Sequence, residues 1–487
     1  MELLNKSSRF LSSSLVRNSS WGIFSNILQT LFVSLFFVLV ARKYSPDVFA
    51  EFLVSTTVYQ LMAAFSSMGL GQWFIREYIH ENNKQSFTAK FLKTQIGFGI
   101  LFYIFNIAIA YILYPHSQIR ILCIILGTNI IFDNFINAIR SLNIAEFRQK
   151  KTAAILVIDG FLKLLVGCLL FVYPFSSVIL AILMIAVRVL TVGLFILGTE
   201  NTINLKLIWK VQISGSDLKK LILKNWQFII IGSVSIIYWR IANIIISKTL
   251  SISSVADYEI AFRIFSILQI LPVIASATIF PQFVKYYNDG DIQTLKKLYH
   301  SIFLGYTIFS FLSYAFIYSY ADKILPLAFG NGYPGAAECL QQMFLTFLLL
   351  PTVLLQANLI VAIGLEKMDM WFNIGSLILN IAACLTGLYF FKSLSVINYS
   401  IFSSFIVFHF FQDVLLVRKK MTTTSNATLY YIAMACFVLG YQLLCTYLNP
   451  YILFVLLFGV LICISLIIML KSKSKLFYNL KPLVVQE

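Results

Sequence analysis

Charged side chains are scarce in this sequence, and acidic ones are the scarcest. Asp, Glu, Lys and Arg make up 12% of the 487 residues, against about 25% in ordinary soluble domains. Hydrophobic residues make up 59%, and the mean hydropathy is +0.85. Long apolar runs recur along the whole chain. This composition excludes a soluble globular protein and predicts a polytopic, all-α membrane protein.

Residues that carry catalysis or hold metals are also few. The four histidines and seven cysteines show no metal-ligand or paired spacing, and no GxxxxGK[ST] motif occurs. One GxGxxG match, GNGYPG (330–335), falls in a loop between two apolar runs and contains Pro334, so we interpret it as a turn. His409 lies inside an apolar run, where a packed core residue and a proton relay both remain open. We expect no enzyme activity, no metal and no cofactor.

About fourteen apolar runs are long enough to cross a bilayer as helices. They fall at 21–41, 49–73, 91–113, 119–140, 152–172, 177–197, 226–248, 255–281, 299–320, 338–362, 370–391, 395–417, 428–448 and 450–470. The longest polar interruption predicts an N-terminal lobe (1–197), a cytoplasmic linker (198–225), a C-terminal lobe (226–420), and two further spans with a basic tail (421–487). A faint repeat, VFAEF (48–52) and SVADYEIAF (254–262), suggests duplicated halves with a substrate site between them.

The net charge of +17 comes from basic residues that gather in alternate loops. With the N-terminus inside, segments predicted to be inside hold 27 Lys and Arg, and those predicted to be outside hold 6. Cytoplasmic loops carry the excess of Lys and Arg in membrane proteins. The sequence therefore predicts that both termini are cytoplasmic, and the clustering gives no reason to expect nucleic acid as a partner.

Polar residues inside the apolar runs fall on helical stripes. The stripes consist of Asn18, Gly22, Ser25 and Gln29 in the first span; Asn129, Asp133, Asn137 and Arg140 in the fourth; Ser233, Arg240, Asn243 and Ser247 in the seventh; and Glu259, Arg263 and Ser266 in the eighth. Such stripes face the bundle interior or water, because lipid offers no hydrogen bonds. Stripes in both lobes predict a shared aqueous cavity.

Several deep charges have a structural alternative. Asp159 and Lys163 are four residues apart and can neutralise each other, and Arg188 can pair with Asp159. Asp133 can pair with a cation on a neighbouring helix. Arg240 has no acid within four residues on its own helix, which favours a functional role.

Cations exceed acids deep in the spans. The deep cations are Lys163, Arg188, Arg240 and Arg263, and the deep acids are Asp133 and Asp159, with Glu259 nearer the end of its span. An efflux pump for organic cations would need acids in its cavity. A cationic cavity instead suits an anionic cargo, and phosphate is favoured because arginine binds it bidentately.

Four stretches resemble bacterial polysaccharide flippases of the multidrug, oligosaccharidyl-lipid and polysaccharide exporter superfamily. GLGQWFIRE (69–77) resembles their G-L-G-x-x-x-x-R-E signature, and ARKYSPDVFAEF (41–52), ILPLAFGNGYPGAA (324–337) and QANLIVAIGLEK (356–367) resemble stretches in the same order. YWRIAN (238–243) resembles a family stretch that often reads R-I-D. Here Ala242 and Asn243 stand where an acid is expected, so the ion coupling that family members place there does not carry over directly.

The resemblance implies two six-helix lobes in an inverted V, plus two C-terminal helices. It also implies an O-antigen (Wzx-type) flippase, which moves undecaprenyl-pyrophosphate-linked oligosaccharide to the periplasmic leaflet of the bacterial inner membrane. Membrane lipid, a polysaccharide polymerase and a chain-length regulator are the expected partners. On this reading the substrate is bound by Arg240, Arg263, Lys163, Arg188 and Asn243, while Asp133 and Asp159 are candidates for H⁺ or Na⁺ coupling or gating. Membrane potential alone is the other candidate driving force.

Three alternatives stay open. A flippase for another lipid-linked saccharide, such as the peptidoglycan precursor, would share these features. A multidrug or cation antiporter of the same superfamily would share the fold but should carry cavity acids. A membrane-bound polymerase would need a sizeable outside loop for its catalytic groups, and the longest one here is 321–337.

Overall fold

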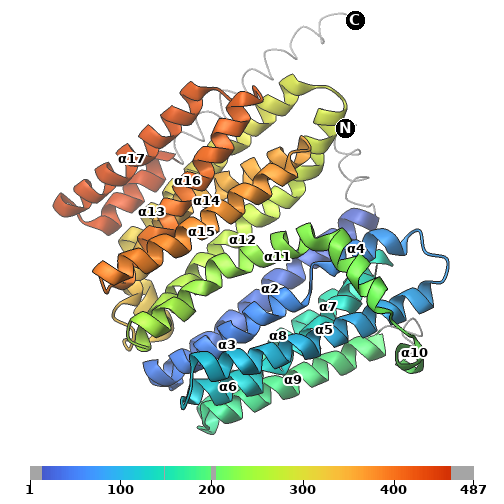
Figure 1. Cartoon of the computed structure of the whole chain (residues 1–487). Helices are drawn as coiled ribbons and strands as arrows, with labels where there is room; N and C mark the ends of the chain where they lie inside the picture. Colours follow the sequence, from blue (N-terminus) through green and yellow to red (C-terminus); the bar gives the residue numbers. More distant parts are fainter. Residues whose placement is uncertain (1–13, 147, 199–204, 462–487) are drawn as a thin grey trace, which may run out of the picture.

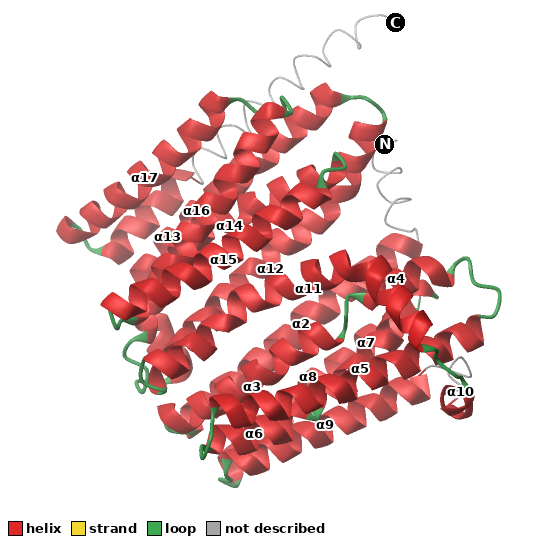
Figure 2. Cartoon of the chain, viewed as in Figure 1, coloured by secondary structure: helices red, strands yellow, loops and turns green. Residues whose placement is uncertain are grey.

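The computed structural model describes residues 14–146, 148–198 and 205–461. Every regular element in these ranges is a helix, and they contain no strand (Figure 2). The fold is therefore all-α, as the composition predicts.

The helices are joined mostly by short loops, and α3 with α4 and α6 with α7 each form one candidate membrane span. Their bounds are α2 (Ser14–Lys43), α3 (Pro46–Ser66), α4 (Leu70–Tyr78), α5 (Lys84–Leu113), α6 (Gln118–Gly127), α7 (Asn129–Ala145), α8 (Gln149–Val172), α9 (Ser177–Gly198), α10 (Leu205–Lys210), α11 (Gly215–Thr249), α12 (Ser253–Asn288), α13 (Ile292–Phe329), α14 (Ala336–Ala362), α15 (Glu366–Phe390), α16 (Leu394–Arg418) and α17 (Thr424–Tyr447).

The helices form two lobes that lie side by side (Figure 1). In the first, α2 packs along α8, and α5 packs on α7 and α3. In the second, α14 is the central helix and packs on α12, α13 and α16. Helix α11 belongs to the second lobe through α15 and α12, and it also lies along α3 of the first. The faces of α11 and α12 that meet α3 are therefore where the two lobes touch.

Eleven helices of the described part are long and apolar enough to cross a membrane, so the chain is a multi-pass membrane protein. Helices α2 and α11 lie where the first and seventh spans are predicted. The last predicted span, 450–470, is described only as a shorter apolar helix, Pro450–Leu461, and the basic tail lies outside the described residues. The count of fourteen and the proposed domain boundaries stay predictions.

The GLGQWFIRE motif breaks a span and holds two helices close together. Met68 and Gly69 both have positive φ angles, 51° and 59°, so α3 ends before them and α4 starts after them. This left-handed conformation suits glycine, which has no Cβ. A Cβ on Gly71 would lie 2.6 Å from Ser141 Oγ of α7. The glycines therefore set both the break and the packing of α4 on α7.

The lobes are joined at the end of the molecule that is predicted to be outside. Arg42 donates to the carbonyl oxygens of Leu327 and, at 2.7 Å, Ala328. Tyr333 donates across the same boundary to Ala41 O at 2.6 Å. Burial, helped by a nearby aspartate, raises the pKa of Tyr333, so its hydroxyl keeps the proton that it donates. These hydrogen bonds join the two lobes at this end.

A second set of contacts joins α5 to α11 at the same end. Tyr114 and Ser247 hydroxyls are 2.6 Å apart, and Lys248 donates to Leu113 O while its ammonium lies 4.0 Å from the centroid of the Tyr114 ring. The first and second lobes thus meet through side chains from four loops or helix ends.

Candidate functional site

One buried carboxylate lies where α11, α12 and α3 meet. Glu259 of α12 is 1% exposed and forms ion pairs with Arg240 of α11 and, at 3.6 Å, with Arg263 one turn further along α12. Asn243 of α11 donates to Glu259 Oε1 at 2.6 Å. The same amide nitrogen is 2.8 Å from Thr57 Oγ1 of α3. The cluster around Glu259 therefore contacts both lobes.

This cluster carries more positive than negative charge. Two arginines share one carboxylate, which leaves an excess of one positive charge. Each guanidinium also lies over an aromatic ring, Arg240 over Phe262 at 5.2 Å and Arg263 over Phe37 of α2 at 3.7 Å. The donor Arg263 Nε and the acceptor Glu259 Oε2 are both buried and have no hydrogen-bond partner among the described residues. An unpaired buried donor is unfavourable, so an anion at this position would be stabilised.

A second charged cluster lies within the first lobe. Asp159 of α8 is fully buried and accepts from Lys163 Nζ at 2.6 Å, Arg188 Nη1 at 3.3 Å and Thr191 Oγ1 at 3.0 Å. Arg188 of α9 also pairs through Nε with Asp133 of α7 at 3.0 Å. Two acids balance two cations here, so this cluster is internally neutral.

The two clusters are close to each other. A cavity of about 110 Å³ in the first lobe is lined by Lys163, Arg188, Phe37, Tyr59 and others. Phe37 lies under the guanidinium of Arg263, so its ring separates the cavity from the Glu259 cluster. Tyr59 is close enough to Arg188, Arg240 and Arg263 to interact electrostatically with all three. Lys163 and Arg188 therefore line the cavity, while Arg240 and Arg263 lie near Phe37 and Tyr59, two residues of its wall.

A larger cavity lies toward the end that is predicted to be cytoplasmic. Its volume is about 280 Å³, and polar side chains from α4, α5 and α7 line much of it. These include Gln72 of the GLGQWFIRE motif, Gln95, Asn137 and Arg140. Arg140 contacts Asn137 Oδ1 at 3.4 Å, so its guanidinium retains free donors.

Each residue predicted for the site has a defined place, and Arg240 has a partner on another helix that the sequence did not indicate. The pairs of Asp159 with Lys163 and with Arg188 are present, and Asp133 has its cation on a neighbouring helix. The partner of Arg240 is Glu259, which the sequence placed nearer the end of a span. Sequence reasoning also missed Thr57, Phe37 and the polar network around His409. Their contacts join helices that are far apart in the chain, where no spacing rule applies.

The fold defines the class, a polytopic, all-α membrane protein. A family model described as polysaccharide biosynthesis protein matches residues 15–287, which is more than half of the chain. The chain belongs to this polysaccharide biosynthesis protein family. No curated protein matches the sequence.

Solved structures share the fold at low sequence identity. An inward-facing multidrug resistance MATE family transporter of the MOP superfamily has a TM-score of 0.67 and 14% identity, over 81% of this chain and 96% of that one. An outward-facing form of such a transporter gives 0.57 and 14%, over 84% and 95%. A MOP superfamily transporter from Pyrococcus furiosus, whose reverse-polarity binding pocket suggested a different function, gives 0.59 and 14%, over 84% and 96%. These likenesses establish the MATE-like fold.

Proposed function

We propose that the protein is a flippase for an undecaprenyl-pyrophosphate-linked oligosaccharide, such as an O-antigen or similar polysaccharide repeat unit. The observation that carries the proposal is the positive excess around Glu259, at the contact between the lobes, together with the unpaired Nε of Arg263. Membership in a polysaccharide biosynthesis family supports a saccharide cargo. The MATE-like fold supports movement across the membrane rather than covalent chemistry.

The pyrophosphate would be bound by Arg240 and Arg263. Guanidinium groups form paired, charge-assisted hydrogen bonds to phosphate oxygens. Glu259 holds both arginines before substrate binds, so phosphate competes with a carboxylate that is already in place. In the empty transporter, the Glu259 carboxylate is the counter-ion of the two buried arginines. Asn243 would donate to the same group of oxygens once Glu259 moves aside.

The saccharide would lie toward the first lobe. Lys163, Arg188 and Tyr59 line the small cavity there, and they offer donors and an aromatic face to sugar hydroxyls and ring carbons. The larger cavity with Arg140 faces the predicted cytoplasmic end, where the substrate would first meet the protein. The prenyl tail would stay in lipid.

Alternating access would complete the cycle. The bonds of Arg42 and Tyr333 join the two lobes at the end that is predicted to be outside, and rocking of the lobes would break them. An inside-negative potential favours outward movement of an anion by roughly 2.3 kcal/mol per charge per 100 mV. The expected setting is the bacterial inner membrane, with a polymerase and a chain-length regulator acting on the flipped units.

The test is a strain that lacks this gene. Lipid-linked saccharides are extracted, and the leaflet that holds them is determined. We expect single repeat units to accumulate on the cytoplasmic side, with loss of surface polymer that the gene restores. Single units exposed on the outer face would indicate a polymerase instead. Unchanged lipid-linked sugars would refute the proposal and favour export of small molecules. The chemistry of the trapped saccharide would distinguish a polysaccharide unit from the peptidoglycan precursor.

A further inference from the structure

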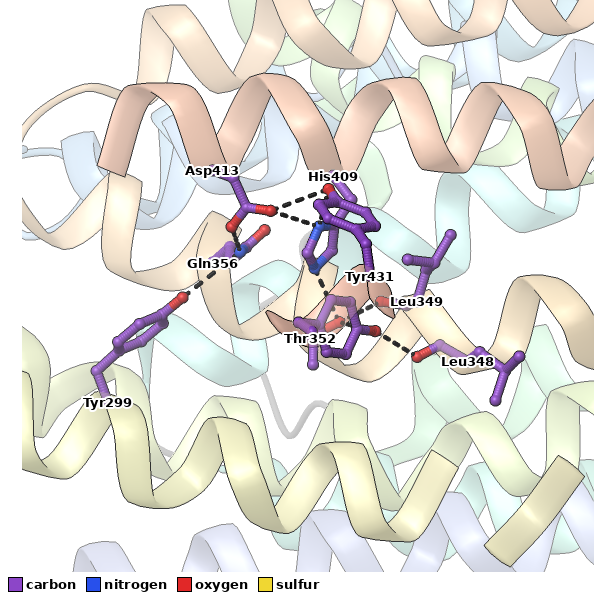
Figure 3. A network of polar contacts seen from close by, with 9 residues as sticks. Tyr299, Leu348, Leu349, Thr352, Gln356, His409, Asp413 and Tyr431 are labelled. Atoms are coloured by element: carbon purple, nitrogen blue, oxygen red, sulfur yellow. Dashed lines mark hydrogen bonds and ion pairs between the residues drawn. The ribbon is translucent and has the colours of Figure 1, made fainter. Parts of the chain in front are cut away.

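A buried polar network lies in the second lobe, away from the two charged clusters (Figure 3). His409 Nδ1 of α16 is 2.9 Å from Asp413 Oδ2, and His409 Nε2 is 3.2 Å from Thr352 Oγ1 of α14. A neutral imidazole that donates through Nδ1 and accepts at Nε2 satisfies both contacts. This network therefore holds helices of one lobe together. The larger cavity of the first lobe differs from it, because a cation in its wall has free donors.

The larger cavity lies where α4 packs on α7. Gly71 and Gln72 of the GLGQWFIRE motif line it from α4, and Asn137, Arg140 and Ser141 line it from α7. A Cβ on Gly71 would lie 2.6 Å from Ser141 Oγ, so the close approach of the two helices requires glycine here. The motif thus brings Gln72 and Arg140 to the wall of one cavity.

Arg140 is half-buried in this wall and has no acidic partner among the described residues. Its guanidinium contacts Asn137 Oδ1 at 3.4 Å, which is longer than a normal hydrogen bond. Asp133, the acidic residue of α7, forms its ion pair with Arg188 at 3.0 Å. Arginine binds carboxylates and phosphates through paired, charge-assisted hydrogen bonds. The cavity therefore favours a ligand that carries a negative charge.

The other polar groups in the wall both donate and accept hydrogen bonds. Gln72 and Asn137 are exposed, and each side-chain amide has donors and an acceptor. Ser67 and Ser141 donate their hydroxyl protons to backbone carbonyl oxygens at 3.0 Å, so their oxygen lone pairs remain for a ligand that donates. Sugar hydroxyls donate and accept, whereas a fully ionised phosphate only accepts. The wall therefore matches a negatively charged sugar better than a simple anion.

The larger and the small cavity lie along the same polar stripe of α7. Asn129 lines the small cavity, and Asn137 and Arg140 line the larger one. Between Asn129 and Arg140 the helix rises about 16 Å. Arg263, which would bind the pyrophosphate, lies against Phe37 in the wall of the small cavity. Two phosphates joined by one oxygen are too short to span this distance as well, so an anionic group at Arg140 is a different part of the substrate.

We propose that the larger cavity is a saccharide subsite that selects a sugar with a carboxylate, and that Arg140 binds this carboxylate. The proposal rests on the proposed function, since it requires the pyrophosphate of the same molecule at Arg240 and Arg263. The saccharide then extends from the contact of the lobes along the α7 stripe toward the end that is predicted to be cytoplasmic. Gln72 and Asn137 bind hydroxyl groups of the acidic sugar. The repeat unit is thus an acidic saccharide.

The first test is the composition of the lipid-linked saccharide that accumulates in a strain lacking this gene. Mass spectrometry before and after conversion of carboxylates to methyl amides counts the carboxylate groups on the saccharide. We expect at least one sugar with a carboxylate in the repeat unit. A repeat unit without a carboxylate would overturn the acidic subsite, while its accumulation on the cytoplasmic side would still support the flippase.

The second test compares how two forms of this lipid bind to the purified full-length protein. One form is native, and in the other the sugar carboxylates are methyl amides; both keep the pyrophosphate. The unaltered protein should bind the native form about 10- to 100-fold more tightly, as expected for a charge-assisted hydrogen bond. Arg140→Gln should bind both forms equally. Arg140→Lys keeps the charge without the planar fork of donors, so it should keep part of the preference.

The matched control is Arg120→Gln, at the outer end of the first lobe, which should keep the full preference. Equal binding of the two forms by the unaltered protein would overturn the proposal. A full preference that survives in both Arg140 variants would also overturn it, and a loss of affinity for both forms alike would assign Arg140 to the pyrophosphate or to lipid headgroups. No binding of either form by the unaltered protein would refute the proposed function itself, and the subsite with it.

Discussion

Replacing Arg240 by lysine separates a phosphate-binding role from a structural one. Arg240 pairs with Glu259 through one nitrogen, Nη1, and lies over the ring of Phe262. Lysine keeps the positive charge, so it can preserve both the ion pair and the contact with the ring. It lacks the planar fork of donors that binds phosphate bidentately. A purely structural Arg240 should therefore tolerate lysine, and a phosphate-binding one should not.

The expected size of the effect follows from the donors that are lost. One charge-assisted hydrogen bond contributes about 1.5–3 kcal/mol, and 1.4 kcal/mol corresponds to about tenfold in rate or affinity. Arg240→Lys should therefore reduce transport by roughly 10- to 100-fold. The melting temperature should change little, because Glu259 keeps a cationic partner. Arg240→Gln should lower both, since it leaves Glu259 with Arg263 alone, and breaking a buried pair costs about 3–5 kcal/mol.

The assay is restoration of surface polymer in the deletion strain, normalised to the amount of protein in the membrane, together with thermal unfolding in detergent. The matched control is Arg120→Lys, since Arg120 also lies over an aromatic ring, Tyr111 at 4.9 Å, but at the outer end of the first lobe. It should keep full transport. Full transport by Arg240→Lys at a normal protein level would refute the phosphate-binding role.

Three further results are expected. Arg42→Gln removes the bonds to two carbonyl oxygens across the predicted outer end. Spin labels on the outer loops of the two lobes should therefore report a larger population of open molecules, by about tenfold for each lost bond of 1.4 kcal/mol. The control Arg120→Gln lies within one lobe and should not change this population. Gly127→Ala places a Cβ 2.3 Å from a buried amide nitrogen and should destabilise by about 1–3 kcal/mol. The control Gly97→Ala, inside α5, meets open space, so its melting temperature should stay the same or rise slightly, because alanine favours helix over glycine. Asn243→Asp adds an acid beside the Glu259 carboxylate and cancels the positive excess. The amount of lipid-linked saccharide that co-purifies with the protein should therefore fall at least tenfold. Equal co-purification would contradict the electrostatic argument.

The helical class, the spans and the local ion pairs could be predicted from the sequence, because they depend on neighbours in the chain. Asp159 and Lys163 are one turn apart, and a turn of helix brings them together at 2.6 Å. The stripe of Arg240 and Asn243 was recognisable for the same reason, since three residues along a helix share a face. Hydropathy and periodicity both report on short stretches.

The partners across helices could not be predicted in this way. Glu259 is 19 residues from Arg240, beyond a loop, and its pairing depends on how α11 and α12 cross. Thr57 reaches Asn243 from a helix 186 residues earlier. His409 looked like an isolated core residue because its hydroxyl partners, Thr352 and Tyr431, come from two other helices. Polar contacts are stronger in the buried interior than in water, but the tertiary packing determines which residues make them.

The central claim is that the arginines around Glu259 hold a lipid-linked pyrophosphate. The most direct measurement is mass spectrometry of lipids that co-purify with the protein from the cells that carry this gene, comparing the unaltered protein with the double variant Arg240→Gln, Arg263→Gln. We expect a polyprenyl-pyrophosphate saccharide on the unaltered protein and at least a tenfold loss from the variant. Equal retention by the variant, or no such lipid on the unaltered protein, would contradict the claim.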